Sequence, residues 1–231
     1  MELPRTVEGR FVRRENRFRV AVEVDGRVEA AHLPNSGRLG GLLVPGRRCY
    51  LVPRSSPGRR TPYDLLLVAH AGVLVSVDAR LPNPLFAEAV AAGRLAPFAG
   101  VTRVAREVRH GGSRIDFRLE GAWGTCWVEA KSVTLVEDGV ALFPDAPTGR
   151  GRRHLEDLIT LVREGHRAAV VFVVQRPDAR AFAPNGRTDP AFARMLAEAA
   201  AQGVEVYAYR CRVTRKAISI APPGLSIVVK T

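Results

Sequence analysis

Three charged residues that could act together stand in two short apolar segments, Ser113–Phe117 and Val128–Ser132. The first segment contains Asp116, and the second contains Glu129 and Lys131. The interval between the two acids is long enough for one strand to end, turn and return as its neighbour. Glu129 and Lys131 are two positions apart, so a strand directs both side chains to the same face. We therefore expect the three charged groups to meet at one place on a sheet.

Two carboxylates buried side by side are unfavourable unless a cation compensates them. Mg²⁺ (or Mn²⁺) bound by Asp116 and Glu129 would do so, because these ions prefer oxygen ligands and water. A metal of this kind lowers the pKa of bound water and polarises a phosphodiester, and Lys131 could hold the water and stabilise phosphate charge. The pattern thus predicts a hydrolytic phosphodiester site. The alternative is an ordinary surface ion pair, because an acid and a lysine two residues apart form a short motif.

Two further residues are candidates for the same site. Glu88 lies on an expected helix before the sheet, where it could add a third carboxylate, although a solvated helix face is the more common explanation of such a residue. Gln175 follows the apolar segment Val170–Val174 and could orient water or substrate, or be structural.

The charge balance favours a polyanionic partner. The chain has 35 Lys and Arg against 23 Asp and Glu, a net charge of +12, and nearly all the positive charge is arginine. Such a field attracts nucleic acid by releasing condensed counterions, and guanidinium forks suit phosphate oxygens. An arginine-rich composition can also follow from a GC-rich genome. The candidate DNA contacts are Asn35, Arg38, Arg114, Arg150, Arg152 and Arg153.

These contacts fall in three places, of which the first is Arg114 in the segment Ser113–Phe117. Arg150, Arg152 and Arg153 open an expected helix, whose N-terminus attracts phosphate. Asn35 and Arg38 belong to the loop Pro34-Asn35-Ser36-Gly37-Arg38, which could present backbone N–H groups to an anion or be a simple turn.

The cysteines and the apolar runs exclude several classes of protein. Cys49, Cys126 and Cys211 are far apart and lack CxxC spacing, which argues against a disulfide framework and a thiolate zinc site. No apolar run approaches the roughly 20 residues that span a bilayer, and the first residues lack the apolar stretch of a secretory signal. We expect a cytoplasmic protein without a membrane partner. The oligomeric state stays open, a homodimer included.

Residues 5–80 read as all-β. Apolar and polar residues alternate in short segments, and Gly and Pro turns such as Asp25-Gly26 separate them. About five short strands favour a small OB-like β-barrel. The best boundary is Leu81-Pro82-Asn83-Pro84, where Asn83 could cap a helix and Pro84 fit its first turn. We expect domains at 1–82 and 83–231.

The second part mixes strands and helices in the order α-β-β-β-α-β-α-β. Helices are expected near residues 84–92, 150–164 and 190–202, and strands near 101–108, 113–120, 126–132, 168–174 and 204–213. This order predicts an α/β fold (α+β mixed), a mixed sheet with flanking helices.

Several long motifs resemble the sugar fermentation stimulation protein A (SfsA) family over essentially the whole chain. They are PNSGR at 34–38, SRIDF at 113–117, VEAKSVTL at 128–135, FPDAPTGRGRRHL at 143–155, VVFVVQRPDA at 170–179 and TDPAFA at 188–193. The resemblance implies an N-terminal OB-like domain, a C-terminal PD-(D/E)xK nuclease-like domain, DNA binding and a regulatory role in sugar (maltose) metabolism. It puts Asp116 at the aspartate position, Glu129 and Lys131 at the ExK positions, and Glu88 where an acid of the first helix can occur.

Three functions therefore compete. The first is a Mg²⁺-dependent nuclease acting on double- or single-stranded DNA. The second is a non-catalytic DNA-binding regulator that keeps the nuclease fold as a scaffold. The third is RNA binding by the barrel, where bases would stack on aromatic side chains. The aromatic residues available for it are Phe11, Phe18, Tyr50 and Tyr63.

Overall fold

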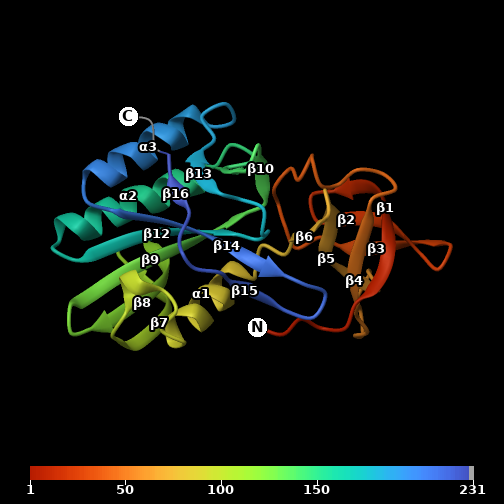
Figure 1. Cartoon of the computed structure of the whole chain (residues 1–231), viewed down its shortest axis with the longest axis horizontal. Helices are drawn as coiled ribbons and strands as arrows, with labels where there is room; N and C mark the ends of the chain where they lie inside the picture. Colours follow the sequence, from red (N-terminus) through yellow and green to blue (C-terminus); the bar gives the residue numbers. More distant parts are fainter. Residues whose placement is uncertain (229–231) are drawn as a thin grey trace.

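The computed structural model describes residues 1–228 and consists of a β-barrel joined to a larger body of strands and helices (Figure 1). The barrel strands are β1 (Val7–Asn16), β2 (Arg19–Val24), β3 (Arg27–His32), β4 (Arg48–Pro53), β5 (Tyr63–His70) and β6 (Val73–Ser76). They follow the order β3-β2-β1-β4-β5-β6, and a parallel pairing of β3 with β5 closes the sheet. The predicted OB-like barrel is confirmed, with β6 as an extension beyond the five closing strands.

The turns of the barrel and the alternation of apolar and polar residues along its strands both favour closure. Asp25 and Gly26 both have positive φ angles, 49° and 75°, as a two-residue turn between twisted antiparallel strands requires. Val20, Val22 and Leu51 point inward and are fully buried. Burial of such side chains contributes about 1.5–3 kcal/mol each.

The larger body contains one six-stranded sheet with helices on both faces. Its helices are α1 (Pro82–Ala91), α2 (Gly149–Arg163) and α3 (Pro190–Ala201), with a short 3₁₀ turn at Ala96–Phe98. Its strands are β7 (Val101–His110), β8 (Ser113–Gly121), β9 (Gly124–Val133), β12 (Arg167–Val174), β14 (Glu205–Val213) and β15 (Ile218–Ile220), in the order β15-β14-β12-β9-β8-β7. β12 runs parallel to β9 and β14, so the predicted mixed sheet is confirmed.

Two apolar layers hold this body together. One layer packs α1 against the sheet through residues such as Phe86 and Phe117. The other packs α2 and α3 against the opposite face through residues such as Leu158, Phe172 and Phe192. Alternate residues of β9 therefore face different layers. The layer that each polar residue of this strand faces is decided by the same alternation.

A second, smaller sheet was not predicted. It consists of β10 (Leu135–Glu137), β11 (Val140–Phe143), β13 (Ala181–Pro184) and β16 (Ser226–Ile227). These strands are too short to show a period in the sequence. β10 follows β9 almost directly and lies next to the barrel (Figure 1), so this sheet forms part of the wall between the two units.

The start of α1 differs from the expectation. Leu81 is the N-cap, no side chain caps the helix, and Pro82 begins it. Asn83 is therefore free to contact another element. By contrast, Gly93 follows the helix with a φ of 64°, as is typical of a residue just past a helix end, and the Asp189 side chain caps α3 by accepting the Phe192 N–H at 2.9 Å.

The first residues of the chain lie on the second unit rather than on the barrel. Leu3 N–H donates to the Lys216 carbonyl at 2.8 Å, and the Met1 amine donates to the Ile218 carbonyl at 3.0 Å. Among residues 1–228, no helix has the length and apolar content to cross a bilayer.

Candidate active site

The three charged residues of the two central segments meet as predicted. β8 and β9 run antiparallel, and their ladder pairs Phe117 with Val128. Asp116 lies one position before Phe117 and Glu129 one position after Val128, so the two acids are cross-strand neighbours. The contact is direct: the Asp116 N–H points to Glu129 Oε2 at 3.4 Å, and Asp116 Oδ2 accepts the Ala130 N–H at 3.0 Å.

Glu129 is the most buried member, with only 3% of its side chain exposed. Its Oε1 atom accepts a hydrogen bond from Lys131 Nζ at 2.7 Å and also contacts His154 Nδ1. His154 belongs to α2 and is itself buried. One carboxylate therefore joins the sheet to the helix that covers it.

His154 lies in a network of polar contacts around Glu129. Arg150 Nε donates to His154 Nε2 at 3.2 Å, and Lys131 Nζ lies 3.0 Å from His154 Nδ1. His154 Nδ1 also contacts Glu129 Oε1. This arrangement fixes the orientation of the Glu129 carboxylate in the way a supporting hydrogen bond fixes a metal ligand.

Asn83 supports Asp116 in the way that His154 supports Glu129. Its Nδ2 atom donates to Asp116 Oδ1 at 2.9 Å. Asn83 and His154 were not predicted as members of the site. The signals are weak: Asn83 resembles a helix cap, and His154 directly follows the arginines of the helix start, although it lies with Leu155 on the buried stripe of α2.

The pKa values of Asp116 and Glu129 are shifted in opposite directions. Burial, and then the charge of Glu129, raise the pKa of Asp116 above its ordinary value. Burial also acts to raise the pKa of Glu129, but the His154 hydrogen bond and the Lys131 charge outweigh it, and the pKa of Glu129 is lowered. The site therefore holds one well-compensated carboxylate and one that lacks a cation.

Glu88 and Gln175 are not brought to this cluster. Glu88 is on α1 but pairs with the Met1 amine and with Arg94, each at 2.7 Å, on the surface. Gln175 is fully buried at the junction of the two units. Its Nε2 donates to the Asp78 carbonyl at 3.0 Å and to Ser132 Oγ at 2.9 Å. Ser132 is adjacent to Lys131 in the strand, so it faces the opposite side of the sheet.

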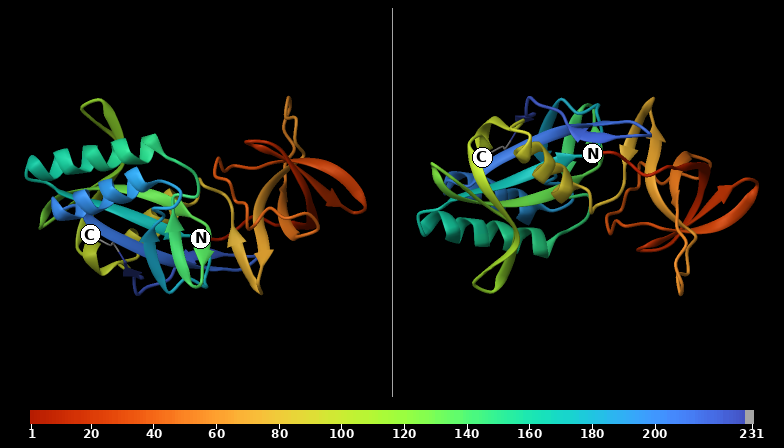
Figure 2. Two further views of the ribbon diagram at one scale, coloured as in Figure 1. Left: turned by 90° about the horizontal axis from the view of Figure 1, so that it is seen from above. Right: turned by 90° about the horizontal axis from the view of Figure 1, so that it is seen from below.

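Three of the six candidate DNA contacts surround the mouth of the site. An open cavity of about 230 Å³ is lined by Gly112, Ser113, Arg114, Arg150, Arg153 and His154. The turn between β7 and β8 stands beside α2 in both views of Figure 2, which brings Arg114 opposite Arg150 and Arg153. His154 connects this basic mouth to Glu129.

The other three candidate contacts lie elsewhere. Arg152 is bound to Asp189, with Nη1 at 2.8 Å from Oδ2, and thus supports the α3 cap. Asn35 is buried: its Nδ2 donates to the Val77 carbonyl at 3.0 Å and its Oδ1 accepts the Gly37 N–H at 2.8 Å. Arg38 is exposed but lines a different cavity, between the barrel and the larger body.

The barrel offers little aromatic surface for stacking bases. Phe11 and Tyr50 are buried, with 2% and 6% exposed, whereas Phe18 is 46% exposed. Phe18 already lies under the Arg17 guanidinium. This distribution gives the predicted RNA-stacking function no continuous platform.

The residues of the cluster suit a hard divalent cation. In the described part of the chain no group of three or more His, Cys, Asp or Glu side chains forms a metal-binding set. Asp116 and Glu129 nevertheless leave carboxylate oxygens available, since Glu129 Oε2 has only the long contact to the Asp116 N–H. Two carboxylates completed by water match Mg²⁺, Mn²⁺ or Ca²⁺ rather than a sulfur- or nitrogen-seeking ion.

Comparison with known proteins gives the same relatives over both units. The family described as "Sugar fermentation stimulation protein RE domain" matches residues 80–217, and the "SfsA N-terminal OB domain" matches residues 12–77. A sugar fermentation stimulation protein homolog of Moorella thermoacetica is 50% identical over 226 residues, which cover 96% of this chain and 97% of that protein. A homolog of Chloroflexus aurantiacus is 50% identical, covering 93% of this chain and 83% of that protein.

A solved structure extends the likeness to the whole fold. Pyrococcus furiosus SfsA in complex with Ca²⁺ superposes with a TM-score of 0.90 at 35% identity, covering 99% of this chain and 98% of that one. The resemblance found in the motifs is thus confirmed by sequence and by structure. The chain belongs to the sugar fermentation stimulation protein family.

Proposed function

We propose that the protein binds DNA in the cytoplasm and hydrolyses its phosphodiester bonds with a divalent metal held by Asp116 and Glu129. The observation that carries this proposal is the convergence of Asp116, Glu129 and Lys131 beneath a mouth lined by arginines. A scaffold that only bound DNA would have no need to bury two acids and an amine together, because such burial is costly.

The uncompensated charge of Asp116 supports the metal. The raised pKa of Asp116, due to burial and then to Glu129, indicates a site that lacks positive charge. Mg²⁺ or Mn²⁺ would supply that charge, lower the pKa of bound water and polarise the phosphorus. The relative from Pyrococcus furiosus was solved with Ca²⁺, which prefers the same oxygen ligands.

The remaining side chains have separate roles in this proposal. Lys131, 11% exposed, can donate to a phosphate oxygen or to the attacking water while it keeps its bond to Glu129. His154 and Asn83 orient the two carboxylates from α2 and α1. Preorganised donors of this kind stabilise charge in the transition state without reorganisation.

The arginines of the mouth would hold the phosphates that flank the bond to be cut. Arg114 and Arg153 are exposed, and within residues 1–228 the one ion pair of Arg114 is with Glu107, at 3.4 Å. Contacts to phosphate position a nucleic acid without reading its sequence. We therefore expect structure-selective rather than sequence-selective binding to DNA.

Cleavage of plasmid, single-stranded and branched DNA with Mg²⁺ or Mn²⁺ tests the proposal. Asp116→Asn and Lys131→Met should each reduce the rate at least about a hundredfold. Glu88→Gln is the matched control, since it changes an acid of the first helix that lies outside the cluster, and it should retain the wild-type rate.

Two outcomes would contradict the nuclease. One is DNA that is bound but uncut under all these conditions, which instead favours the non-catalytic regulator of sugar metabolism. The other is equal cleavage by the wild type and Asp116→Asn, which would identify a contaminating enzyme.

A further inference from the structure

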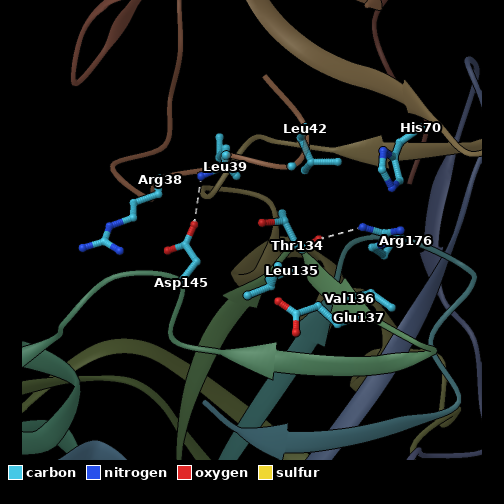
Figure 3. A pocket seen from close by; sticks show the side chains of 12 residues that line it. Arg38, Leu39, Leu42, His70, Thr134, Leu135, Val136, Glu137, Asp145 and Arg176 are labelled. Carbon is cyan, nitrogen blue, oxygen red and sulfur yellow. Dashed lines mark hydrogen bonds between the residues drawn. The ribbon is translucent and has the colours of Figure 1, made fainter. Parts of the chain in front are cut away.

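A second cavity, of about 350 Å³, lies between the barrel and the larger body. The loop 38–42 and His70 form its barrel side. The segment 134–137, Asp145 and Arg176 form the other side (Figure 3). This size falls within the range of small-molecule sites. None of the clustered residues of the candidate active site lines it, so it is a separate site.

The walls of this cavity are apolar. Leu39 and Leu42 of the barrel core line it on one side (Figure 3). Leu135 and Val136 of β10 line it on the other, and Val136 also packs against the core of the larger body. Opposed apolar walls suit a flat ring rather than a sugar, whose hydroxyl groups would lose their hydrogen bonds to water.

The barrel wall is held in a strained and preorganised conformation. Leu39 has a φ of 52°, in the left-handed region that bulky residues avoid. Its N–H donates to Asp145 Oδ2 at 3.2 Å across the cavity. Gly37 leaves room for this approach: a Cβ there would lie 2.5 Å from the same carboxylate oxygen, so the Asp145 side chain would have to move. Such strain persists only where surrounding contacts enforce it, and it occurs most often at functional sites.

Polar groups at the edges could recognise the ring. Arg47 donates to His70 Nδ1 at 2.7 Å, so a neutral His70 carries its proton on Nε2 as a donor. Burial, and then the charges of Arg176 and Arg47, lower the pKa of His70 and keep it neutral at pH 7. The Thr134 hydroxyl makes no hydrogen bond within residues 1–228 and can both donate and accept.

Two arginines and two acids line the cavity, and most of these charged groups already have partners. Glu137 is already paired with Arg187, and Asp178 with Arg176. Asp145 accepts the Leu39 N–H. Arg38, exposed at one end, forms no ion pair in the described part of the chain. An anionic group attached to the ring would therefore find its partner at Arg38.

From this arrangement we propose that the cavity binds one nucleotide unit, with the base between Leu42 and Leu135 and the phosphate at Arg38. His70 and Thr134 hydrogen-bond to the edge of the base. The unit is either a free nucleoside monophosphate or an unpaired nucleotide of a DNA strand. Residues 134–137 continue directly from β9, so a bound nucleotide contacts the segment next to the strand that carries Glu129 and Lys131.

Isothermal titration calorimetry of the full chain in EDTA tests this binding. The probes are the four deoxynucleoside monophosphates, a single-stranded tetranucleotide, inorganic phosphate and maltose. Wild type should bind nucleotide, whereas phosphate alone and maltose should give no saturable heat. Tighter binding of the tetranucleotide identifies a strand as the source, and equal or tighter binding of a mononucleotide identifies free nucleotide.

Two variants localise the site. Arg38→Ala, on the surface, should weaken binding about tenfold by removing a charge-assisted hydrogen bond. Thr134→Val removes an unpartnered hydroxyl at nearly constant volume and should weaken binding a few-fold for some bases only. Arg27→Ala, another exposed arginine of the barrel, is the control and should bind as wild type does.

The proposal is overturned by an absence of binding at millimolar nucleotide, by phosphate or maltose binding as tightly as nucleotide, or by Arg38→Ala binding as wild type does. It is independent of the proposed nuclease. Asp116→Asn should keep nucleotide binding while losing cleavage, so the two ideas fail separately.

Discussion

Replacing Asp116 with Asn should make the metal-free protein no less stable, and should abolish its stabilisation by metal. The pKa of Asp116 is raised by burial and then by Glu129, so folding favours its protonated form. The resulting penalty on the ionised form is absent below the ordinary pKa of an aspartate and complete above the raised one. At neutral pH the variant removes that penalty. It also keeps both hydrogen bonds if the Asn83 amide turns over, because amide orientation is free to adapt.

The size of the metal effect follows from mass action. At a concentration of Mn²⁺ about 100 times its Kd, the folded state gains about 2.7 kcal/mol. For a chain of this length that corresponds to a rise in Tm of about 5–10 °C. Loss of one of the two carboxylates, if it weakens binding about a hundredfold, leaves about 0.4 kcal/mol, a rise of only about 1 °C.

Differential scanning calorimetry with and without Mn²⁺ measures both effects on the same samples. The expected result is a large shift for wild type and almost none for Asp116→Asn, from a metal-free baseline that is unchanged or higher. An equal shift in the two proteins would refute the metal assignment. A metal-free variant less stable than the metal-free wild type by more than about 2 kcal/mol would refute the electrostatic reasoning. Such a loss is expected when the acid that is removed stabilises the folded state.

Three further changes test other parts of the structure. Arg153→Ala should weaken DNA binding and reduce the slope of log affinity against log salt by about 1, whereas Arg194→Ala on the exposed face of α3 should not; fluorescence anisotropy in a salt series measures both. Asp189→Ala should lower the free energy of unfolding in urea by about 2–4 kcal/mol, because Asp189 caps α3 and accepts the Thr148 N–H. Burial acts to raise the pKa of Asp189, but its hydrogen bonds lower it overall, so this difference should shrink as the pH falls below the ordinary aspartate pKa. Glu107→Gly should raise the Tm by a few degrees, because Glu107 has a φ of 52° within a strand.

Much of the fold was predictable because its signals are local. The strands of the barrel alternate, the buried strand β12 is continuously apolar, and the ends of the helices carry residues such as Gly93 and Asp189 at the positions that capping requires. The small sheet of β10, β11, β13 and β16 was not predictable. Strands of two to four residues have no period, and their pairings join parts of the chain far apart in sequence.

The candidate site divides in the same way. Asp116, Glu129 and Lys131 could be placed together because strand geometry fixes which residues face one another. Asn83 and His154 could not, because each reaches the site from a helix whose docking angle depends on the packed core. Gln175 was misplaced for a related reason: its position at the end of β12 was correct, but its side chain turns to the junction with the barrel.

The most direct measurement is anomalous scattering from a crystal of the protein soaked in Mn²⁺. The account predicts an anomalous peak between the carboxylates of Asp116 and Glu129, close to Lys131, and its loss in Asp116→Asn crystals. A saturating soak that leaves this position empty, or a peak that forms elsewhere and survives the substitution, would contradict the assignment of these residues as a metal-dependent hydrolytic site.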